Sequence, residues 1–432
     1  MPVPPTSDSP ADLSAVLSDI VKAYDIRGVF GEQLTTEVAR RVGAAFAALV
    51  GSEARAVLVG RDMRTSSPAL AEAFGEGVRD QGLDVVDIGL ASTDLLYFAA
   101  GSFSAPGAMV TASHNPGKYN GFKLCRAGAV PIADELGRIR TDAARGLPPA
   151  PVRGERSVRH FLDGYVDYLR KLVDLSGGRP LKVVVDAGNG MAGYTAPAVF
   201  AGPPIELVEL YCELDGTFPN HEANPLEPAN LADLCARVVA EGADAGLAFD
   251  GDADRCFVVD ERGEPVSASA ITGLVATREL AKEPGASVIY NLITSRAVPE
   301  IVSAAGGAPV RTRVGHSFIK KTMAETGAIF GGEHSAHYYF RDFWCADSGM
   351  LAALHVLAAL SGQEGALSGL MADYHRYAAS GEINSTVADP AERMAEVARE
   401  YGRRDGVRID ELDGVTVNLP DGSWFNLRPS NT

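Results

Sequence analysis

The stretch Leu181-Lys182-Val183-Val184-Val185-Asp186 has the composition of a short buried β-strand. It ends at a glycine-rich turn, and the residues that follow have the apolar spacing of a helix. Two further β-rich runs, 56–60 and 287–290, are followed by helical patterns in the same way and at roughly similar intervals. Strands that alternate with helices are typical of α/β domains. The sequence therefore predicts three related mixed α/β domains.

Changes in composition divide the chain into four predicted domains. A proline-rich segment, residues 146–151, separates the first two α/β units. After about residue 372 the pattern changes to a smaller α+β unit, with strands expected around 407–409, 415–419 and 424–427. The chain stops shortly after the last strand with nothing to cover its edge, so we expect this fourth domain to be incomplete. The predicted domains span 1–148, 149–255, 256–372 and 373–432.

Composition restricts the class of protein. The 432 residues are 46% hydrophobic and 22% charged, which is ordinary for a folded domain and excludes intrinsic disorder. Lys and Arg number 39 against 56 Asp and Glu, a formal charge of -17, which disfavours nucleic acid and anionic membranes as partners. There is no apolar run of membrane-spanning length and no signal-peptide pattern at the start, so we expect a cytoplasmic protein.

A polar loop around Ser113 follows an apolar run at 107–110. Its sequence is Thr111-Ala112-Ser113-His114-Asn115-Pro116, with Lys123 a few residues beyond. A hydroxyl at the end of a strand, close to backbone N–H groups and a cation, could carry a phosphoryl group. A plain polar turn is the alternative. A serine hydrolase is a weaker interpretation, because the positions that need glycine hold Thr111 and Asn115.

Three alternating carboxylates form the sharpest local signal. They lie in Asp250-Gly251-Asp252-Ala253-Asp254-Arg255, directly after an apolar run at 245–249. Oxygen ligands at this spacing suit a divalent cation such as Mg²⁺. A calcium-binding EF-hand is disfavoured because Arg255 occupies the position that requires glycine. A solvated acidic turn remains as the other alternative.

Residues 188–193 match the GxGxxG pattern and follow the strand at 181–186, as in a dinucleotide-binding fold. Asp186 directly precedes the pattern, and Pro197 interrupts the helix that would receive the pyrophosphate. We therefore favour a tight turn at a domain interface over an NAD site.

A loop with the sequence Gly332-Glu333-His334-Ser335-Ala336-His337 carries several hydrogen-bonding groups, which suit the hydroxyls of a sugar. Zinc binding by the two histidines is the competing interpretation, although the HExxH order is absent. His316, in Gly315-His316-Ser317, is as a lone histidine more often structural than catalytic.

Two arginine-containing segments lie near the ends of the chain, at 24–28 and 428–432. The planar guanidinium suits phosphate oxygens, although either arginine could be an ordinary surface residue.

Read together in chain order, five segments resemble the α-D-phosphohexomutase family, in particular its bacterial phosphomannomutase/phosphoglucomutase branch. They are residues 24–28, 111–116, 250–255, 332–335 and 428–432. The resemblance implies four domains around a central cleft, with a phosphoserine at Ser113. It also implies a Mg²⁺ ion held by the serine phosphate and three carboxylates: Asp250, Asp252 and Asp254.

The same resemblance implies roles for the remaining candidates. The catalytic set is Ser113, His114, Arg27 and Lys123. The substrate-binding set is Tyr24, Arg255, His316, Glu333, His334, Ser335, His337, Arg428, Ser430, Asn431 and Thr432, of which the last four would hold the substrate's own phosphate. The general acid or base is left open among Arg27, Lys123, His316 and His337.

The implied reaction interconverts mannose 6-phosphate and mannose 1-phosphate through a hexose 1,6-bisphosphate, with glucose phosphates also accepted. The loop at 332–337, followed by Tyr338-Tyr339-Phe340, resembles the phosphomannomutase type of this family, which implies mannose as the sugar. A phosphoglucomutase, a phosphoglucosamine mutase or a non-catalytic sugar-phosphate-binding relative remain as alternatives. Ile293 stands before Thr294-Ser295-Arg296, where some relatives carry lysine, so a lysine contact there is in doubt. We expect a monomer or a weak homodimer.

Overall fold

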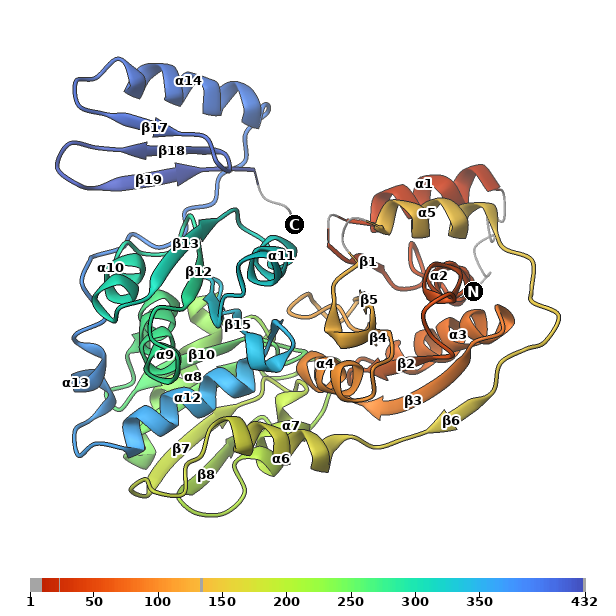
Figure 1. Cartoon of the computed structure of the whole chain (residues 1–432), viewed down its shortest axis with the longest axis horizontal. Helices are drawn as coiled ribbons and strands as arrows, with labels where there is room; N and C mark the ends of the chain where they lie inside the picture. Colours follow the sequence, from red (N-terminus) through yellow and green to blue (C-terminus); the bar gives the residue numbers. More distant parts are fainter. Residues whose placement is uncertain (1–9, 23, 133–134, 430–432) are drawn as a thin grey trace.

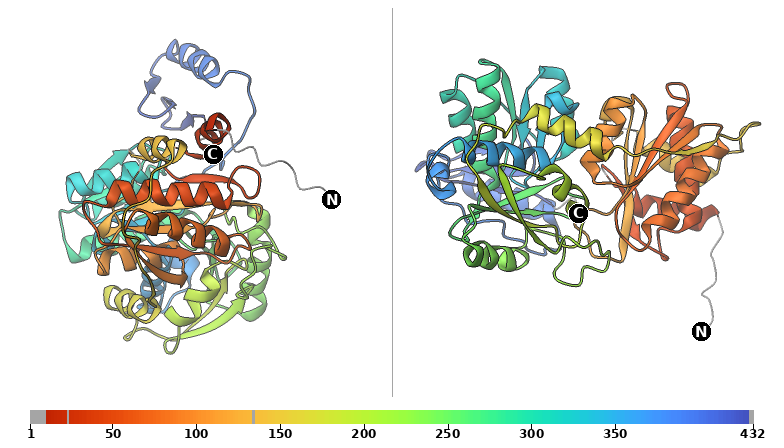
Figure 2. Two further views of the ribbon diagram at one scale, coloured as in Figure 1. Left: turned by 90° about the vertical axis from the view of Figure 1, so that its right-hand side faces the viewer. Right: turned by 90° about the horizontal axis from the view of Figure 1, so that it is seen from below.

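The computed structural model describes residues 10–22, 24–132 and 135–429. It contains three mixed α/β domains and a small fourth domain, which projects beyond the third (Figures 1 and 2). The predicted fold class is confirmed, whereas a central cleft between the domains stays a prediction.

The first domain is built on a six-stranded sheet in the order β1-β5-β4-β2-β3-β6. β1 and β5 are antiparallel to each other and β5 is antiparallel to β4, while the remaining neighbours are parallel. The strands are β1 (Ile26–Val29), β2 (Ala56–Arg61), β3 (Asp84–Leu90), β4 (Gly107–Val110), β5 (Tyr119–Cys125) and β6 (Arg156–Val158). The helices are α1 (Pro10–Ile20), α2 (Thr36–Val50), α3 (Ser67–Asp80), α4 (Thr93–Ser102) and α5 (Leu136–Arg145).

The second domain has a five-stranded sheet in the order β11-β10-β9-β7-β8. Its strands are β7 (Leu181–Asp186), β8 (Ile205–Leu210), β9 (Ala245–Phe249), β10 (Cys256–Asp260) and β11 (Pro265–Val266). Its helices are α6 (Leu162–Leu172), α7 (Ala192–Val199) and α8 (Ala232–Glu241). β7 begins and ends at the residues that the opening stretch of the sequence predicts.

The third domain repeats this arrangement with the strand order β13-β12-β14-β15-β16. Its strands are β12 (Ser287–Asn291), β13 (Ala308–Thr312), β14 (Phe330–Gly332), β15 (Tyr338–Phe340) and β16 (Ala346–Asp347). Its helices are α9 (Ala268–Lys282), α10 (Ala297–Ala304), α11 (His316–Thr326), α12 (Gly349–Ser361) and α13 (Leu367–Met371). The fourth domain packs α14 (Pro390–Gly402) on an antiparallel sheet of β17 (Arg408–Asp410), β18 (Val415–Asn418) and β19 (Trp424–Leu427).

Strand pairing corrects two of the predicted domain boundaries. β6 lies after the predicted boundary at residue 148, yet it pairs with β3 because the linker runs along the edge of the first sheet. β10 lies after the predicted boundary at residue 255, yet it forms a hairpin with β9. The metal loop is therefore the turn of a hairpin and does not end a domain.

One hydrophobic core runs through the first three domains. Buried side chains from α4, β7 and α12, such as Leu96, Val183 and Leu354, belong to the same contiguous cluster. A second cluster packs α2 and α3 against the other face of the first sheet. The fourth domain, in contrast, buries two hydrophobic side chains among its described residues, Val415 and Val417, and α14 has none. None of the helices in the described part of the chain is long and apolar enough to cross a membrane.

Candidate active site

Ser113 lies in the loop between β4 and β5, where the chain leaves the first sheet. Its backbone has a φ of +50°, in the left-handed region that residues other than glycine rarely adopt. The Ser113 N–H donates to Thr111 Oγ1 at 3.0 Å. The side chain is buried, and its hydroxyl donates to Asp250 Oδ2 at 2.7 Å. The phosphoserine candidate and the carboxylate loop, separated by 137 residues in the sequence, are thus in direct contact.

The three aspartates of the loop after β9 are all buried, which excludes a solvated acidic turn. Ligand atoms from Asp250, Asp252 and Asp254 lie within 4.8 Å of one another. Arg255, also buried, donates from Nε and Nη2 to Asp250 Oδ2 at 3.0 and 2.9 Å. The arginine therefore neutralises one carboxylate of the triad.

Lys123, on β5, reaches the other two carboxylates. Its Nζ donates to Asp252 Oδ2 at 2.7 Å and to Asp254 Oδ2 at 2.5 Å. The Oδ1 atoms of both aspartates are buried and have no hydrogen-bond partner. A buried carboxylate oxygen without a partner is costly, and a divalent cation would satisfy both atoms. The residues present therefore fit a metal site.

The pKa values of Asp252 and Asp254, the two carboxylates that bind Lys123, are shifted in opposite directions. Burial works against ionisation of both, but the Lys123 ammonium holds the pKa of Asp252 below its usual value. Burial and the neighbouring Asp252 charge raise the pKa of Asp254 well above its usual value. When two carboxylates lie close together, the charge on one raises the pKa of the other, so their pKa values are expected to differ. The same repulsion favours the binding of a further cation beside them.

The sugar-loop candidates approach the same place from the third domain. Arg255 and His337 form an isolated β-bridge, and His337 Nε2 lies 3.6 Å from Asp254 Oδ1. The other imidazole nitrogen, Nδ1, is 3.1 Å from Ser335 Oγ. Glu333 is buried, and its two oxygens accept bonds from Tyr339 Oη at 2.5 Å and Asn291 Nδ2 at 2.9 Å. The loop that carries these groups is thus fixed against the metal loop.

The remaining candidates lie around this group. Arg27 donates to Asn115 Oδ1 at 2.5 Å beside the serine loop. His114 Nδ1 is 3.2 Å from Ser113 Oγ, and burial lowers the pKa of His114 well below its usual value. The Tyr24 ring meets the His316 ring edge-on at 5.1 Å between centroids, which joins the first domain to the third.

The fourth domain brings Arg428 toward the same candidates. Burial raises the pKa of Tyr24 and lowers that of His334, and the Arg428 cation is one of the charges that act on both groups. The predicted phosphate-binding residues Ser430, Asn431 and Thr432 lie outside the described residues.

Comparison with known proteins agrees with this arrangement. Three models match in order, for domains I, II and III of phosphoglucomutase/phosphomannomutase, over residues 18–146, 163–263 and 268–377. The chain is 41% identical to the phosphomannomutase of Escherichia coli K12 over 424 residues, covering 95% of this chain and 92% of that protein. The chain belongs to the phosphoglucomutase/phosphomannomutase family.

Two further relatives support this membership. A protein named "phosphohexose mutases" from Xanthomonas campestris is 42% identical over 419 residues, with 95% of this chain and 92% of that protein covered. The crystal structure of a phosphoglucomutase/phosphomannomutase family protein from Burkholderia thailandensis superposes with a TM-score of 0.84 at 36% identity, covering 95% of this chain and 90% of the other. The family predicted from the sequence is therefore confirmed.

In this family member the GxGxxG pattern supports the metal loop. The Met191 N–H donates to the carbonyl of Gly251 at 2.9 Å. A Cβ on Gly190 would lie 2.8 Å from that same carbonyl oxygen, and one on Gly193 would lie 2.1 Å from the carbonyl oxygen of Cys212. These glycines permit close backbone contacts, which is the tight-turn interpretation that the sequence favoured over an NAD site.

Sequence reasoning missed several buried polar residues of the site. Thr93 donates from Oγ1 to Asp252 Oδ2 at 2.6 Å, and Arg64 binds the serine loop from behind. Lys320 Nζ, on α11, lies 2.6 Å from Asp347 Oδ1, and both side chains are buried. The His316 and His337 imidazoles are close enough to act on the Asp347 carboxylate. A usable signal existed for Arg64 alone: the charged run Arg61-Asp62-Met63-Arg64 follows the β-rich segment at 56–60 directly.

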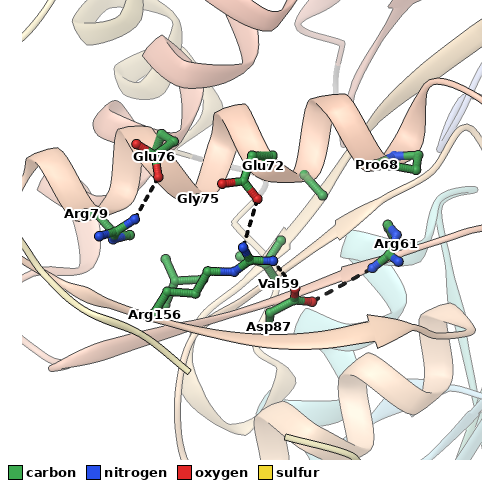
Figure 3. Close-up of a pocket in the computed structure, with 11 residues that line it drawn as sticks. Val59, Arg61, Pro68, Glu72, Gly75, Glu76, Arg79, Asp87 and Arg156 are labelled. Carbon is green, nitrogen blue, oxygen red and sulfur yellow. Dashed lines mark hydrogen bonds and ion pairs between the residues drawn. The ribbon is translucent and has the colours of Figure 1, made fainter. Parts of the chain in front are cut away.

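A cavity of about 180 Å³ lies elsewhere, between α3 and the β2–β3 part of the first sheet (Figure 3). Its arginines are each paired with a carboxylate: Arg79 with Glu76 at 2.8 Å, Arg156 with Asp87 at 2.6 Å, and Arg61 with Asp87 at 3.9 Å. None of its lining residues is a candidate from the sequence. Because its cations are already neutralised, it is a poor anion site and does not compete with the Ser113 site.

Proposed function

We propose that this protein is a phosphomannomutase, which interconverts mannose 6-phosphate and mannose 1-phosphate through a phosphoserine at Ser113. The observation that carries the proposal is the 2.7 Å hydrogen bond from Ser113 Oγ to Asp250 Oδ2 at the edge of a buried carboxylate triad. A phosphoryl group on that oxygen would lie next to the metal ligands. The name of the Escherichia coli relative supports mannose as the sugar.

The proposed reaction has two half-reactions. In the first, the bond from phosphorus to Ser113 Oγ breaks, a bond to a free hydroxyl oxygen of the hexose phosphate forms, and the hydroxyl proton passes to a base. The hexose 1,6-bisphosphate then turns around in the site. In the second, its other phosphoryl group returns to Ser113 Oγ and the released sugar oxygen regains a proton, so the phosphoenzyme is restored.

Charge neutralisation is the main task of the surrounding residues. Mg²⁺ is the proposed metal, held by Asp250, Asp252, Asp254 and an oxygen on Ser113, and when bound it supplies positive charge beside the phosphoryl group. Although burial works against it, the Asp252 and Asp254 charges raise the pKa of Lys123, so its ammonium stays charged. Arg27 and Arg255 are the other cations proposed to face the transferring group.

The general acid or base is proposed to be one of four residues: Arg27, Lys123, His316 and His337. Burial lowers the pKa of His316 to about 3, so its imidazole is neutral at pH 7 but a weak base, because a general base works best with a pKa near the working pH. His114 is proposed to assist at the serine, since its ring lies next to Ser113 Oγ.

Sugar recognition is proposed for the loop at 333–337, with Tyr24 and Arg428 nearby. The Glu333 carboxylate is held on both oxygens, by Tyr339 and Asn291, and a carboxylate fixed in this way can accept further bonds from sugar hydroxyls. Arg428, with Ser430, Asn431 and Thr432, is proposed to hold the phosphate that is not reacting. We further propose a cytoplasmic enzyme that is a monomer or a weak homodimer, with hexose 1,6-bisphosphate as activator.

A coupled isomerisation assay on mannose 1-phosphate, glucose 1-phosphate and glucosamine 1-phosphate tests the substrate. We expect mannose to be turned over with the highest kcat/KM and glucose to be accepted. Intact mass spectrometry tests the mechanism, because Mg²⁺ and glucose 1,6-bisphosphate should add one phosphoryl group and a chelator should prevent its transfer. Failure of both measurements would favour the non-catalytic alternative, while a preference for glucose or glucosamine would favour another mutase of the family.

A further inference from the structure

Arg64 is buried directly behind the serine loop, and every N–H of its guanidinium has a partner in the protein. Nε donates to Asp62 Oδ2 at 3.1 Å. The two Nη atoms donate four bonds of 2.6–3.0 Å to backbone carbonyls of one loop: Ser113, Asn115, Pro116 and Tyr119. A guanidinium has five N–H donors, and all five are used here.

This binding mode excludes direct contact between Arg64 and a phosphate. The side chain is buried, and its partner Asp62 is buried as well. Because all five N–H donors are occupied and the guanidinium is not exposed, it cannot donate a hydrogen bond to a ligand. Its role must therefore be exerted through the loop that it binds.

The loop needs such support at Ser113 in particular. A left-handed backbone at a serine is unfavourable and persists only where the surroundings enforce it. Arg64 fixes the Ser113 carbonyl at 2.8 Å, and Thr111 fixes its N–H. With both peptide groups of Ser113 held, the direction of its Cα–Cβ bond is fixed, and from there the hydroxyl reaches Asp250 Oδ2 at 2.7 Å.

Arg64 also connects this loop to the second domain. The Phe218 ring centroid lies 5.1 Å from Arg64 Cζ. A Cβ on Gly216 would lie 2.5 Å from Arg64 Cα, and one on Gly117, in the serine loop, would lie 2.7 Å from the Gly216 carbonyl oxygen. The domain that carries the metal loop is thus packed against the arginine and the serine loop together.

We infer that Arg64 is a positioning residue, which sets the direction of the Ser113 hydroxyl for phosphoryl transfer without touching the substrate. This inference rests on the proposed function. In this role the Asp62–Arg64 pair binds the backbone of the serine loop and keeps the Ser113 hydroxyl next to the metal-binding carboxylates.

The test compares Arg64→Lys, the double variant Asp62→Asn/Arg64→Met, and Arg40→Lys as a matched control at an exposed arginine that is paired with Asp80 away from the serine loop. The rate of Ser113 phosphorylation by glucose 1,6-bisphosphate is followed by quenched intact mass spectrometry, alongside kcat and KM for the hexose phosphate. Misplacement of a reacting group by about 1 Å can reduce a rate by about 10²-fold. We therefore expect losses of about 10²-fold in the phosphorylation rate and kcat for the first two variants, with KM changed less than about 3-fold.

The outcomes separate the inference from the proposed function. If wild-type Ser113 gains no phosphoryl group, the proposed function fails. If wild type is phosphorylated and the folded Arg64 variants react at the wild-type rate, or lose only affinity, the positioning role is overturned. The double variant removes both buried charges together, so it avoids leaving an unpaired charge and decides the question if Arg64→Lys does not fold.

Discussion

Ser113 carries its hydroxyl on a backbone turned into the left-handed region, and the neighbouring peptide groups hold it there. Replacement of Ser113 by alanine removes the carrier oxygen and leaves the surrounding cations and carboxylates in place. For Ser113→Ala we predict a fall in kcat of at least about 10⁴-fold, with hexose phosphate affinity within about 3-fold of wild type. Calorimetric titration and the coupled assay measure the two quantities. Ser102→Ala, at an exposed serine, is the control, and appreciable turnover in Ser113→Ala would remove the serine from the mechanism.

Gly251 allows the metal loop to pack tightly against the serine loop. A Cβ at this position would lie 2.4 Å from the Ser113 carbonyl oxygen, closer than real atoms approach. We predict that Gly251→Ala pushes the two loops apart and lowers kcat by about 10–100-fold, with an increased Mg²⁺ concentration at half-maximal activity. Gly137→Ala, in α5 where a Cβ has open space, should leave activity unchanged. Wild-type activity in Gly251→Ala would show that the loops tolerate separation.

At the residue scale, the site residues that could be predicted from the sequence are those that lie next to one another along the chain. The alternating aspartates and the Ser113 loop are visible because their chemistry lies within a few consecutive positions. Thr93 could not be recognised, because its role depends on burial and on a partner 159 residues away. For Arg64 the charged run at 61–64 marks the position, but its partner 49 residues away is not visible in the sequence. A single buried polar residue has no local pattern that distinguishes it from a surface residue.

At the scale of elements, the N-terminus of α4 joins three domains. The buried Asp94 carboxylate accepts bonds from Ser92 of its own domain, from Tyr165 Oη on α6 at 2.7 Å and from Ser348 Oγ, the N-cap of α12, at 2.6 Å. One turn further along α4, the Phe98 ring meets Tyr168 and Trp344 from the other two domains. The helix therefore acts as the common joint of the first three domains.

Asp94 gives this joint a pH dependence. Burial raises the pKa of Asp94 from 3.8 to about 6, so the folded protein keeps a proton between about pH 4 and 6 that the unfolded chain releases. The free energy of unfolding should therefore fall as pH rises through this window, by on the order of 2–3 kcal/mol from this group. For Asp94→Asn we predict that this part of the fall is lost.

Urea unfolding followed by tryptophan fluorescence at pH 4.5–7.5 measures the effect, because Trp344 lies at the joint. The difference in unfolding free energy between variant and wild type should shift in favour of the variant as pH rises. Parallel pH profiles for the two proteins would mean that Asp94 does not titrate differently in the folded state.

Strand positions were more predictable from the sequence than strand partners. The expected strands at 407–409, 415–419 and 424–427 match β17, β18 and β19 to within one residue. β6 and β10 were assigned to the wrong domains because pairing is a long-range property, which alternation and turn residues do not encode.

At the scale of the whole molecule, the fourth domain is attached to the third by a small set of polar contacts. Arg296 donates to the carbonyl of Gly422 and to Asn418 Oδ1, each at 2.6 Å, and Arg311 pairs with Asp410. The connecting segment at 377–389 is exposed throughout. This thin attachment makes the position of the fourth domain sensitive to single substitutions.

We predict that Arg296→Ala loosens the fourth domain and raises KM for the hexose phosphate by about 3–10-fold, while kcat changes less than about 2-fold. Arg428, the described part of the proposed phosphate grip, directly follows β19 of this domain, whereas Ser113 and the carboxylates belong to the first two domains. Small-angle scattering should show a larger radius of gyration. Arg404→Ala, at an exposed arginine just beyond α14 that pairs with Glu400, is the control. A large loss of kcat in Arg296→Ala would contradict the assignment of the fourth domain to substrate binding alone.

The single apolar cluster shared by the first three domains restricts how such a chain can be cut or recombined. Although each unit also packs a smaller apolar cluster of its own, an excised unit would expose to water the apolar side chains that it contributes to the shared interior. The fourth domain, which contributes almost nothing to that interior, is the part that evolution or an engineer could replace by itself.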